Sequence, residues 1–180
     1  MKVWSDEDIV SAVRQNPEKG FRMLMAKYRE AVYWHIRRLV VSHADAQDAA
    51  QETFVRIFRS FSQFRGECSF AAWIYRIATN EAMRVLGRCR GGRVSLDDSD
   101  TEAGDMMADE YVDYTDLEAV KLQQAVLSLP PKQQLAFNLR YYSELEYDEI
   151  ADVAGSTVAS VKVNYHLAKE KIKKYMDSMV

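Results

Sequence analysis

Apolar residues recur at three- and four-residue spacing along most of the chain, which predicts α-helices. The clearest stripe would lie on one face of a helix over about 17–41 and consists of Phe21, Met25, Tyr28, Val32, Ile36 and Leu39. A shorter helix ending near residue 15 is expected before it, because Ser5 and Asp8 have capping-box spacing and Asn16-Pro17 is typical of a helix start. No stretch of useful length alternates between apolar and polar residues. The pattern therefore predicts an all-α protein.

Two further helices are expected in the first half of the chain. Asp45 is a candidate cap for the first of them. Its apolar stripe consists of Ala49, Thr53, Ile57 and Phe61. The second helix should begin at Ser69 and reach about Leu86, after a loop over 64–68.

The second half of the chain has its own helix signals. A segment rich in Asp and Glu, 94–114, has no apolar periodicity and is predicted to be a flexible linker. Helix signals resume at Thr115, stop at Pro130-Pro131, and start again with a helix to about Tyr142 and another opening at Ser143. We therefore predict two small helical bundles, over 1–93 and 115–180, joined by the acidic linker.

Residues 147–171 have the spacing of a helix-turn-helix. Gly155 supplies a turn that needs a positive φ, and Ala151 has the small side chain that a close helix crossing requires. Val158 and Val161 are expected to face inward. The second helix would enter the major groove of DNA. Its exposed candidates for DNA contact, which we call the recognition surface, are Thr157, Ser160, Lys162, Val163, Asn164 and His166. A helical hairpin in an interaction module has the same spacing and is the alternative.

The net charge of −3 conceals a strong segregation of charge. Residues 95–118 contain ten acids and no Lys or Arg, and the rest of the chain has 24 bases against 17 acids. Eight arginines against two glutamates lie over 54–93, and five lysines against two acids lie over 157–180. Two basic regions that flank an acidic segment are typical of two phosphate-binding surfaces. The acids would shield these surfaces from nonspecific DNA or serve as a soluble spacer.

The basic stretch also contains aromatic residues. Phe64, Phe70, Trp73 and Tyr75 are interleaved with arginines in the loop and the helix after it. This composition suits a surface that stacks unpaired bases and follows their backbone. Aromatic residues at helical spacing also form cores, and Phe70, Trp73 and Ile77 are the expected buried positions under that alternative.

The sequence gives little support to an enzyme. Phosphate-binding, zinc-protease and serine-hydrolase motifs are missing, the three histidines are scattered, and Cys68 and Cys89 lack metal-ligand spacing. We expect no catalytic residues, no cofactor and no metal. The acidic start of the chain and the lack of about 18 consecutive apolar residues predict a cytoplasmic protein with no membrane insertion.

Two sets of motifs resemble a known family. The first set comprises Asp45-Ala-Gln-Asp48-Ala-Ala-Gln51-Glu52 through Phe58, then Phe64-Arg-Gly and Phe70-Ala-Ala-Trp73-Ile-Tyr75-Arg76 through Asn80. It resembles region 2 of the extracytoplasmic-function (ECF) sigma factors of bacterial RNA polymerase. The second set comprises Leu129-Pro-Pro-Lys-Gln-Gln, Asn138-Leu-Arg-Tyr-Tyr and Tyr147-Asp-Glu-Ile-Ala through Lys162, and resembles their region 4. The two sets stand in the right order with the right gap.

The resemblance implies a protein that binds core RNA polymerase and promoter DNA and directs transcription initiation. Asp48, Gln51 and Glu52, which we call the acidic patch, match the residues that dock on the clamp coiled coil of the largest polymerase subunit. The residues that match the reader of the −10 promoter element, which we call the loop–helix surface, are Phe64, Arg65, Arg76, Asn80, Arg84 and Arg88. In the family this reader captures an unpaired base, a cost that stacking and phosphate contacts offset.

The recognition surface matches the reader of the −35 element but departs from the common pattern. Many members have Ser-Arg after the lysine, whereas this chain has Val163-Asn164. Val163 suits a thymine methyl group and Asn164 suits adenine, so we expect a different −35 preference. The resemblance also implies an inhibitory anti-sigma factor. The alternative function is a stand-alone helix-turn-helix transcription regulator, which would leave 1–93 unexplained.

Overall fold

The structure is a computed structural model that describes residues 4–40, 42–89 and 117–178. All regular elements within these ranges are helical, which confirms the predicted fold class. The helices are α1 (Asp6–Gln15), α2 (Pro17–Leu39), α3 (His43–Ser60) with a 3-10 turn at Phe61–Gln63, α4 (Phe70–Cys89), α5 (Leu117–Leu127), α6 (Pro131–Tyr141), α7 (Tyr147–Ala154) and α8 (Val158–Asp177). The segment predicted to be an acidic linker, 94–114, lies outside the described residues.

Side-chain caps begin α1 and α2 as predicted. The backbone N–H of Asp8 donates to Ser5 Oγ at 3.1 Å, and the Ser5 N–H donates to the Asp8 carboxylate at 3.2 Å. Asn16 Oδ1 accepts from the N–H of Lys19 at 3.1 Å, and Pro17 is the first residue of α2. Each cap satisfies a donor that the first helical turn would otherwise leave unpaired.

Two predicted helix starts are wrong. The cap of α3 is Ser42, whose Oγ accepts from the N–H of Asp45 at 3.3 Å, so Asp45 lies inside the helix. Helix α7 begins at Tyr147 rather than at Ser143, because the N–H of Glu146 pairs with the Glu149 carboxylate at 2.9 Å. In both cases the capping hydrogen bond is made by another polar residue that lies within one helical turn of the predicted cap.

Helices α1–α4 pack around one apolar core. Gly20 lets α1 cross α2 closely, because a Cβ at this position would lie 2.2 Å from the backbone nitrogen of Val13. Between α2 and α4, the Nε2 atom of the fully buried His35 lies 2.8 Å from Thr79 Oγ1, and its ring meets the Tyr75 ring edge-on at 5.2 Å. Helix α4 is therefore anchored along its inner side.

Helices α5–α8 form the predicted C-terminal bundle. Gly155 has φ of 60° between α7 and α8, and Ala151 and Val161 are buried at the crossing, as expected for a helix-turn-helix. Val158 is 37 % exposed, so the prediction that it faces inward is wrong. It stands on the first turn of α8, next to the cap Thr157.

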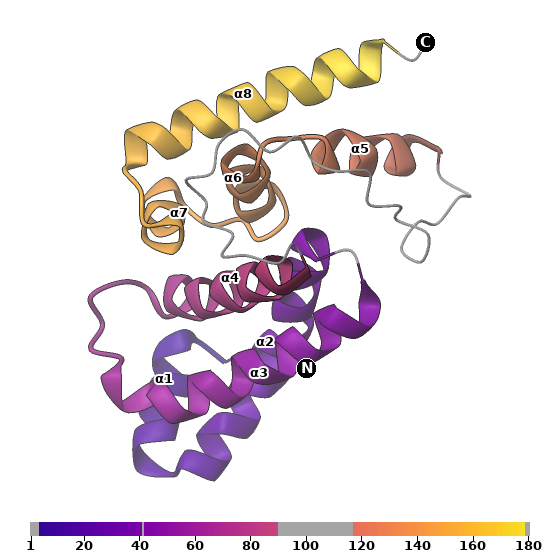
Figure 1. Cartoon of the computed structure of the whole chain (residues 1–180). Coiled ribbons are helices and arrows are strands. Elements are labelled where there is room, and N and C mark those ends of the chain that lie inside the picture. Colours follow the sequence, from indigo (N-terminus) through magenta and orange to yellow (C-terminus); the bar gives the residue numbers. More distant parts are fainter. Residues whose placement is uncertain (1–3, 41, 90–116, 179–180) are drawn as a thin grey trace.

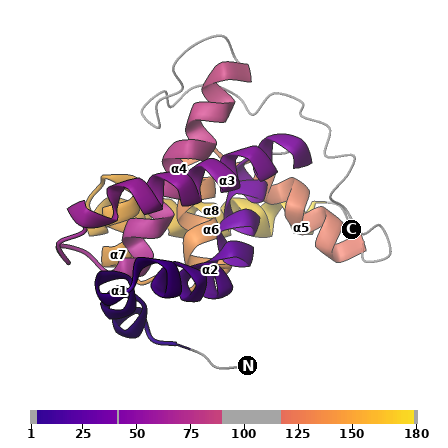
Figure 2. The ribbon, with the colours of Figure 1, turned by 90° about the horizontal axis from the view of Figure 1, so that it is seen from below.

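The two groups of helices lie against each other in two layers, with α4 packed against α7 and α2 against α6 (Figure 1). Seen from the side of α1–α3, helices α6, α7 and α8 lie behind the N-terminal helices, and α5 extends to one side (Figure 2). Ser69 Oγ donates to the Glu149 carboxylate at 2.6 Å, and the Arg38 guanidinium stacks 3.9 Å from the centre of the Tyr142 ring. Buried residues of α2, α4, α6 and α7 form one continuous apolar core.

Candidate nucleic-acid interface and partner-binding surface

The acidic patch lies on the outer side of α3. Asp48 and Gln51 are exposed and Glu52 is half-buried, while the predicted stripe on the other side of the helix packs inward at Ala49, Thr53 and Ile57. The Glu52 carboxylate lies 3.4 Å from Arg56 Nε, one turn along the helix. The three patch residues thus share a surface that is open to a cationic partner.

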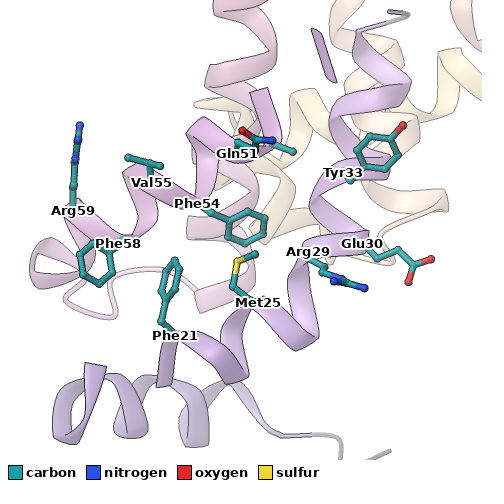
Figure 3. A pocket seen from close by; sticks show the side chains of 11 residues that line it. Phe21, Met25, Arg29, Glu30, Tyr33, Gln51, Phe54, Val55, Phe58 and Arg59 are labelled. Atoms are coloured by element: carbon teal, nitrogen blue, oxygen red, sulfur yellow. The ribbon is translucent and has the colours of Figure 1, made fainter. Parts of the chain in front are cut away.

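An apolar groove of about 1100 Å³ lies between α2 and α3, next to the acidic patch (Figure 3). Gln51 belongs to the patch and also lines the groove. Phe58 is 58 % exposed and Val55 40 % exposed, and Phe58 meets Phe21 of α2 edge-on at 5.3 Å. No sequence pattern predicted this groove. The available signal was that Val55 and Phe58 fall outside the buried stripe of their helix. Contiguous exposed apolar side chains of this kind mark surfaces for protein partners.

Four residues of the loop–helix surface form a stripe along α4. Arg76, Asn80, Arg84 and Arg88 are spaced by four residues and are all exposed. This spacing places them on one side of the helix, with the buried Ala78 and Ala82 on the opposite side. The stripe presents three guanidinium groups and one amide, a set that suits phosphates and a base edge.

The aromatic residues of the loop–helix surface form a cluster. Phe64 is half-buried, and its ring centre lies 5.2 Å from those of both Phe70 and Trp73. The core alternative is confirmed for Phe70, which is 5 % exposed, whereas Trp73 and Ile77 are only partly buried. The aromatic cluster thus packs on the core through Phe70, while Phe64 and Trp73 remain partly exposed to solvent. Arg65, next to this cluster, is exposed.

Two arginines of the α4 stripe are already engaged within the protein. Arg76 Nε donates to the backbone oxygen of Asp152 in α7 at 2.9 Å, so this part of the stripe lies against the C-terminal helices. Arg84 Nε donates to the Glu81 carboxylate at 2.9 Å. Glu81 is buried, and no sequence pattern predicted its pairing with Arg84. The one sequence feature that could have indicated the pairing is that Glu81 is an acidic residue in a stretch rich in arginine.

The recognition surface lies on the first half of α8, whose helix is on the far side of the C-terminal bundle from α4 (Figure 1). Four of its side chains are exposed: Thr157, Lys162, Val163 and His166. Thr157 Oγ1 caps the helix by accepting from the Ser160 N–H at 3.2 Å. Asn164 is half-buried, and its Nδ2 donates to the Ser160 carbonyl oxygen at 3.0 Å. The structure therefore does not bring the recognition surface and the loop–helix surface together.

Two further observations concern metal ligands and membrane spans in the described part of the chain. No three His, Cys, Asp or Glu side chains in it are grouped as metal ligands. None of its helices is long and apolar enough to span a bilayer.

Comparison with known proteins matches both halves of the chain. Residues 24–90 match the model of sigma-70 region 2, and residues 119–172 match that of sigma-70 region 4. The RNA polymerase sigma-H factor of Pseudomonas aeruginosa is 30 % identical over 97 % of this chain and 95 % of its own length. The ECF RNA polymerase sigma-E factor of Haemophilus influenzae is 30 % identical over 93 % of each. The sigma factor RpoE of Bartonella quintana, in co-crystals with the anti-sigma factor NepR, shares the fold with a TM-score of 0.67 at 20 % identity, covering 88 % of this chain and 98 % of its own.

Proposed function

Because the chain belongs to the ECF sigma factors of the sigma-70 family, we propose that residues 1–93 and 115–180 act as two units on one promoter. A sigma factor binds core RNA polymerase and directs sequence-specific promoter recognition and transcription initiation. The stand-alone transcription regulator is not favoured, because the match to region 2 accounts for the first half of the chain as well. We further propose that the chain has no catalytic residues and acts in the cytoplasm, where polymerase and promoter are found.

The acidic patch is the proposed docking site for core polymerase. The support is its geometry: two carboxylates and an amide stand on one side of α3, beside an apolar groove that enlarges the contact area. Charge-assisted bonds to arginines of a partner helix would give this contact its specificity.

Co-elution with core polymerase in gel filtration tests the docking site. Asp48→Arg should abolish stoichiometric co-elution, because it places a cation where the partner presents cations. Glu7→Arg, which reverses a charge on the exposed side of α1, should leave co-elution intact and serves as the control. Unimpaired co-elution of Asp48→Arg would refute this assignment of the patch.

The loop–helix surface is the proposed −10 reader. The observation that carries this proposal is the exposed stripe of Arg76, Asn80, Arg84 and Arg88 beside the aromatic cluster at Phe64. Guanidinium groups would follow the phosphates of the melted strand while the aromatic face stacks an unpaired base. Since Arg76 is bound to α7, its contact with DNA requires that α4 and α7 separate.

The recognition surface is the proposed −35 reader. Thr157 begins α8 with a satisfied cap, so the helix can enter the major groove with its first turn intact. Lys162 and His166 lie on the exposed side of the helix and suit phosphates, and Val163 suits a thymine methyl group.

An anti-sigma factor is the proposed regulatory partner. The support is that RpoE of Bartonella quintana, which has this fold, is crystallised with the anti-sigma factor NepR. A protein that co-purifies with this chain from its own host should compete with core polymerase for it. Simultaneous binding of that protein and of core polymerase would argue against an inhibitor.

A further inference from the structure

A buried carboxylate lies between the acidic patch and the stripe of the loop–helix surface. Glu81, in the middle of α4, is 1 % exposed. One of its oxygens forms an ion pair with Nε of Arg56 on α3. The other accepts from Arg84 Nε at 2.9 Å and lies 2.7 Å from Arg84 Nη2.

These contacts extend to the acidic patch. Arg56 Nε also lies 3.4 Å from the carboxylate of Glu52, one of the three patch residues. Charges of alternating sign thus run from Glu52 through Arg56 and Glu81 to Arg84, across the contact between α3 and α4. The two guanidinium side chains are 48 % and 44 % exposed, whereas the side chain of Glu81 is 2 % exposed.

The geometry has a direct physical consequence for Arg84. A buried carboxylate is costly unless it is paired, so Glu81 holds both guanidinium groups firmly. Two donors of Arg84, Nε and Nη2, face the same carboxylate oxygen, which fixes the plane of the guanidinium group and the direction of its remaining edge. An arginine fixed in this way loses less side-chain entropy when it binds a phosphate.

We propose that Glu81 is a positioning residue that fixes Arg84 in the orientation that contacts promoter phosphate, and that Arg56 ties this arrangement to the helix of the acidic patch. The proposal rests on the proposed role of Arg84 in the −10 reader. Glu81 itself does not touch DNA.

The test is a double-mutant cycle on the holoenzyme, with promoter affinity measured over a range of salt concentrations. Arg84→Ala should reduce the slope of log affinity against log salt by about 0.7 to 0.9, the value for one phosphate contact. Glu81→Gln keeps the shape of the side chain and should remove at least about half of that amount, because Arg84 is then no longer fixed. The double variant should behave as Arg84→Ala alone, because both changes act on one contact.

A matched control separates positioning from net charge. Glu7→Gln removes one negative charge from the exposed side of α1 and should leave the slope unchanged. If Glu81→Gln does not form a holoenzyme, Glu81→Met gives the same test, because it fills a similar volume and leaves two guanidinium side chains that are 48 % and 44 % exposed and can be solvated.

The outcomes distinguish two failures. No change in the Arg84→Ala holoenzyme would refute the role of Arg84 in promoter binding, and the positioning role with it. The positioning role alone would be overturned if Arg84→Ala reduced the slope as expected but the Glu81 variants did not. It would also be overturned if the reductions in slope from the Glu81 and Arg84 changes were additive in the double variant. In that case Glu81 would only join α3 to α4, and lower thermal stability would be its sole effect.

Discussion

The two helices proposed to bind promoter DNA differ in what their polar side chains do before any DNA arrives. On α4, Arg76 is bound to the backbone of α7 and Arg84 to the buried Glu81. On α8, Lys162 and Val163 are exposed on the outer side of the C-terminal bundle. Helix α4 is thus part of an internal network, whereas α8 presents its recognition surface directly.

This difference follows from where each helix is buried. Helix α4 packs against α2, α3 and α7, so a polar side chain on it meets another element within a short distance. Helix α8 packs against α5, α6 and α7 through the buried Val161, Ala168 and Ile172 and through partly buried side chains beside them, and it leaves Lys162, Val163 and His166 exposed. Substitutions on α4 should therefore change stability and DNA binding together, while substitutions on α8 should change DNA binding alone.

The largest expected effect breaks the network under α4. The double variant Arg56→Gln, Arg84→Gln leaves the Glu81 carboxylate buried without a guanidinium partner and should lower the free energy of unfolding by about 3 kcal/mol. Urea unfolding of the free protein measures this loss. His166→Gln on α8 removes a pair with Glu170 in which both side chains are more than 60 % exposed, and should cost less than about 0.5 kcal/mol. Equal losses would remove the contrast between the helices.

The next effect depends on a buried histidine in the first of the two regions. Burial, aided by the charge of Arg38, lowers the pKa of His35 to about 3, so this histidine is neutral in the folded protein. The unfolded chain binds the additional proton between pH 3 and about 6.5. The contribution of His35 to stability is therefore complete above about pH 6.5 and falls as the pH falls toward 3, by about 2 kcal/mol between pH 7 and pH 5.

Unfolding measurements at several pH values check this prediction. His35→Gln should reduce the pH dependence of the free energy of unfolding between pH 7 and pH 5. A parent protein whose stability does not change over this interval would contradict a buried neutral His35.

A smaller effect concerns the contact between α4 and α7. Arg76→Ala removes the bond to Asp152 and should weaken the contact by about 1 kcal/mol, which makes amide exchange in α7 about fivefold faster. Hydrogen exchange of the free protein measures it. Arg88→Ala, further along the same stripe, should leave α7 unchanged. Equal exchange in both variants would show that Arg76 does not hold the two units together.

The sequence predicted the elements better than it predicted the network. Helical periodicity and the caps at Ser5 and Asn16 are local features, and the structure confirms them. The pairing of Glu81 with Arg56 depends on the packing of α3 on α4, which no local pattern reports. The contact between Ser69 and Glu149 joins residues 80 positions apart, so no local sequence pattern predicts it either. Sequence reasoning thus identified the residues of the stripe but not their partners.

The smallest expected effect on stability is that of a substitution in the recognition surface of α8. Asn164 is held by the Ser160 carbonyl oxygen within its own helix, so Asn164→Ala removes a weak local bond and should leave the free energy of unfolding within about 0.5 kcal/mol of the parent value. Its proposed pairing with adenine is worth about 1 kcal/mol or more of discrimination, so a binding screen with randomised −35 sequences should show relaxed preference at one position. Lys162→Ala should instead weaken binding to all sequences alike, because a phosphate contact carries no sequence information. If Asn164→Ala leaves the preference unchanged, Asn164 does not read a base, and sequence selection on α8 must come from the exposed Val163.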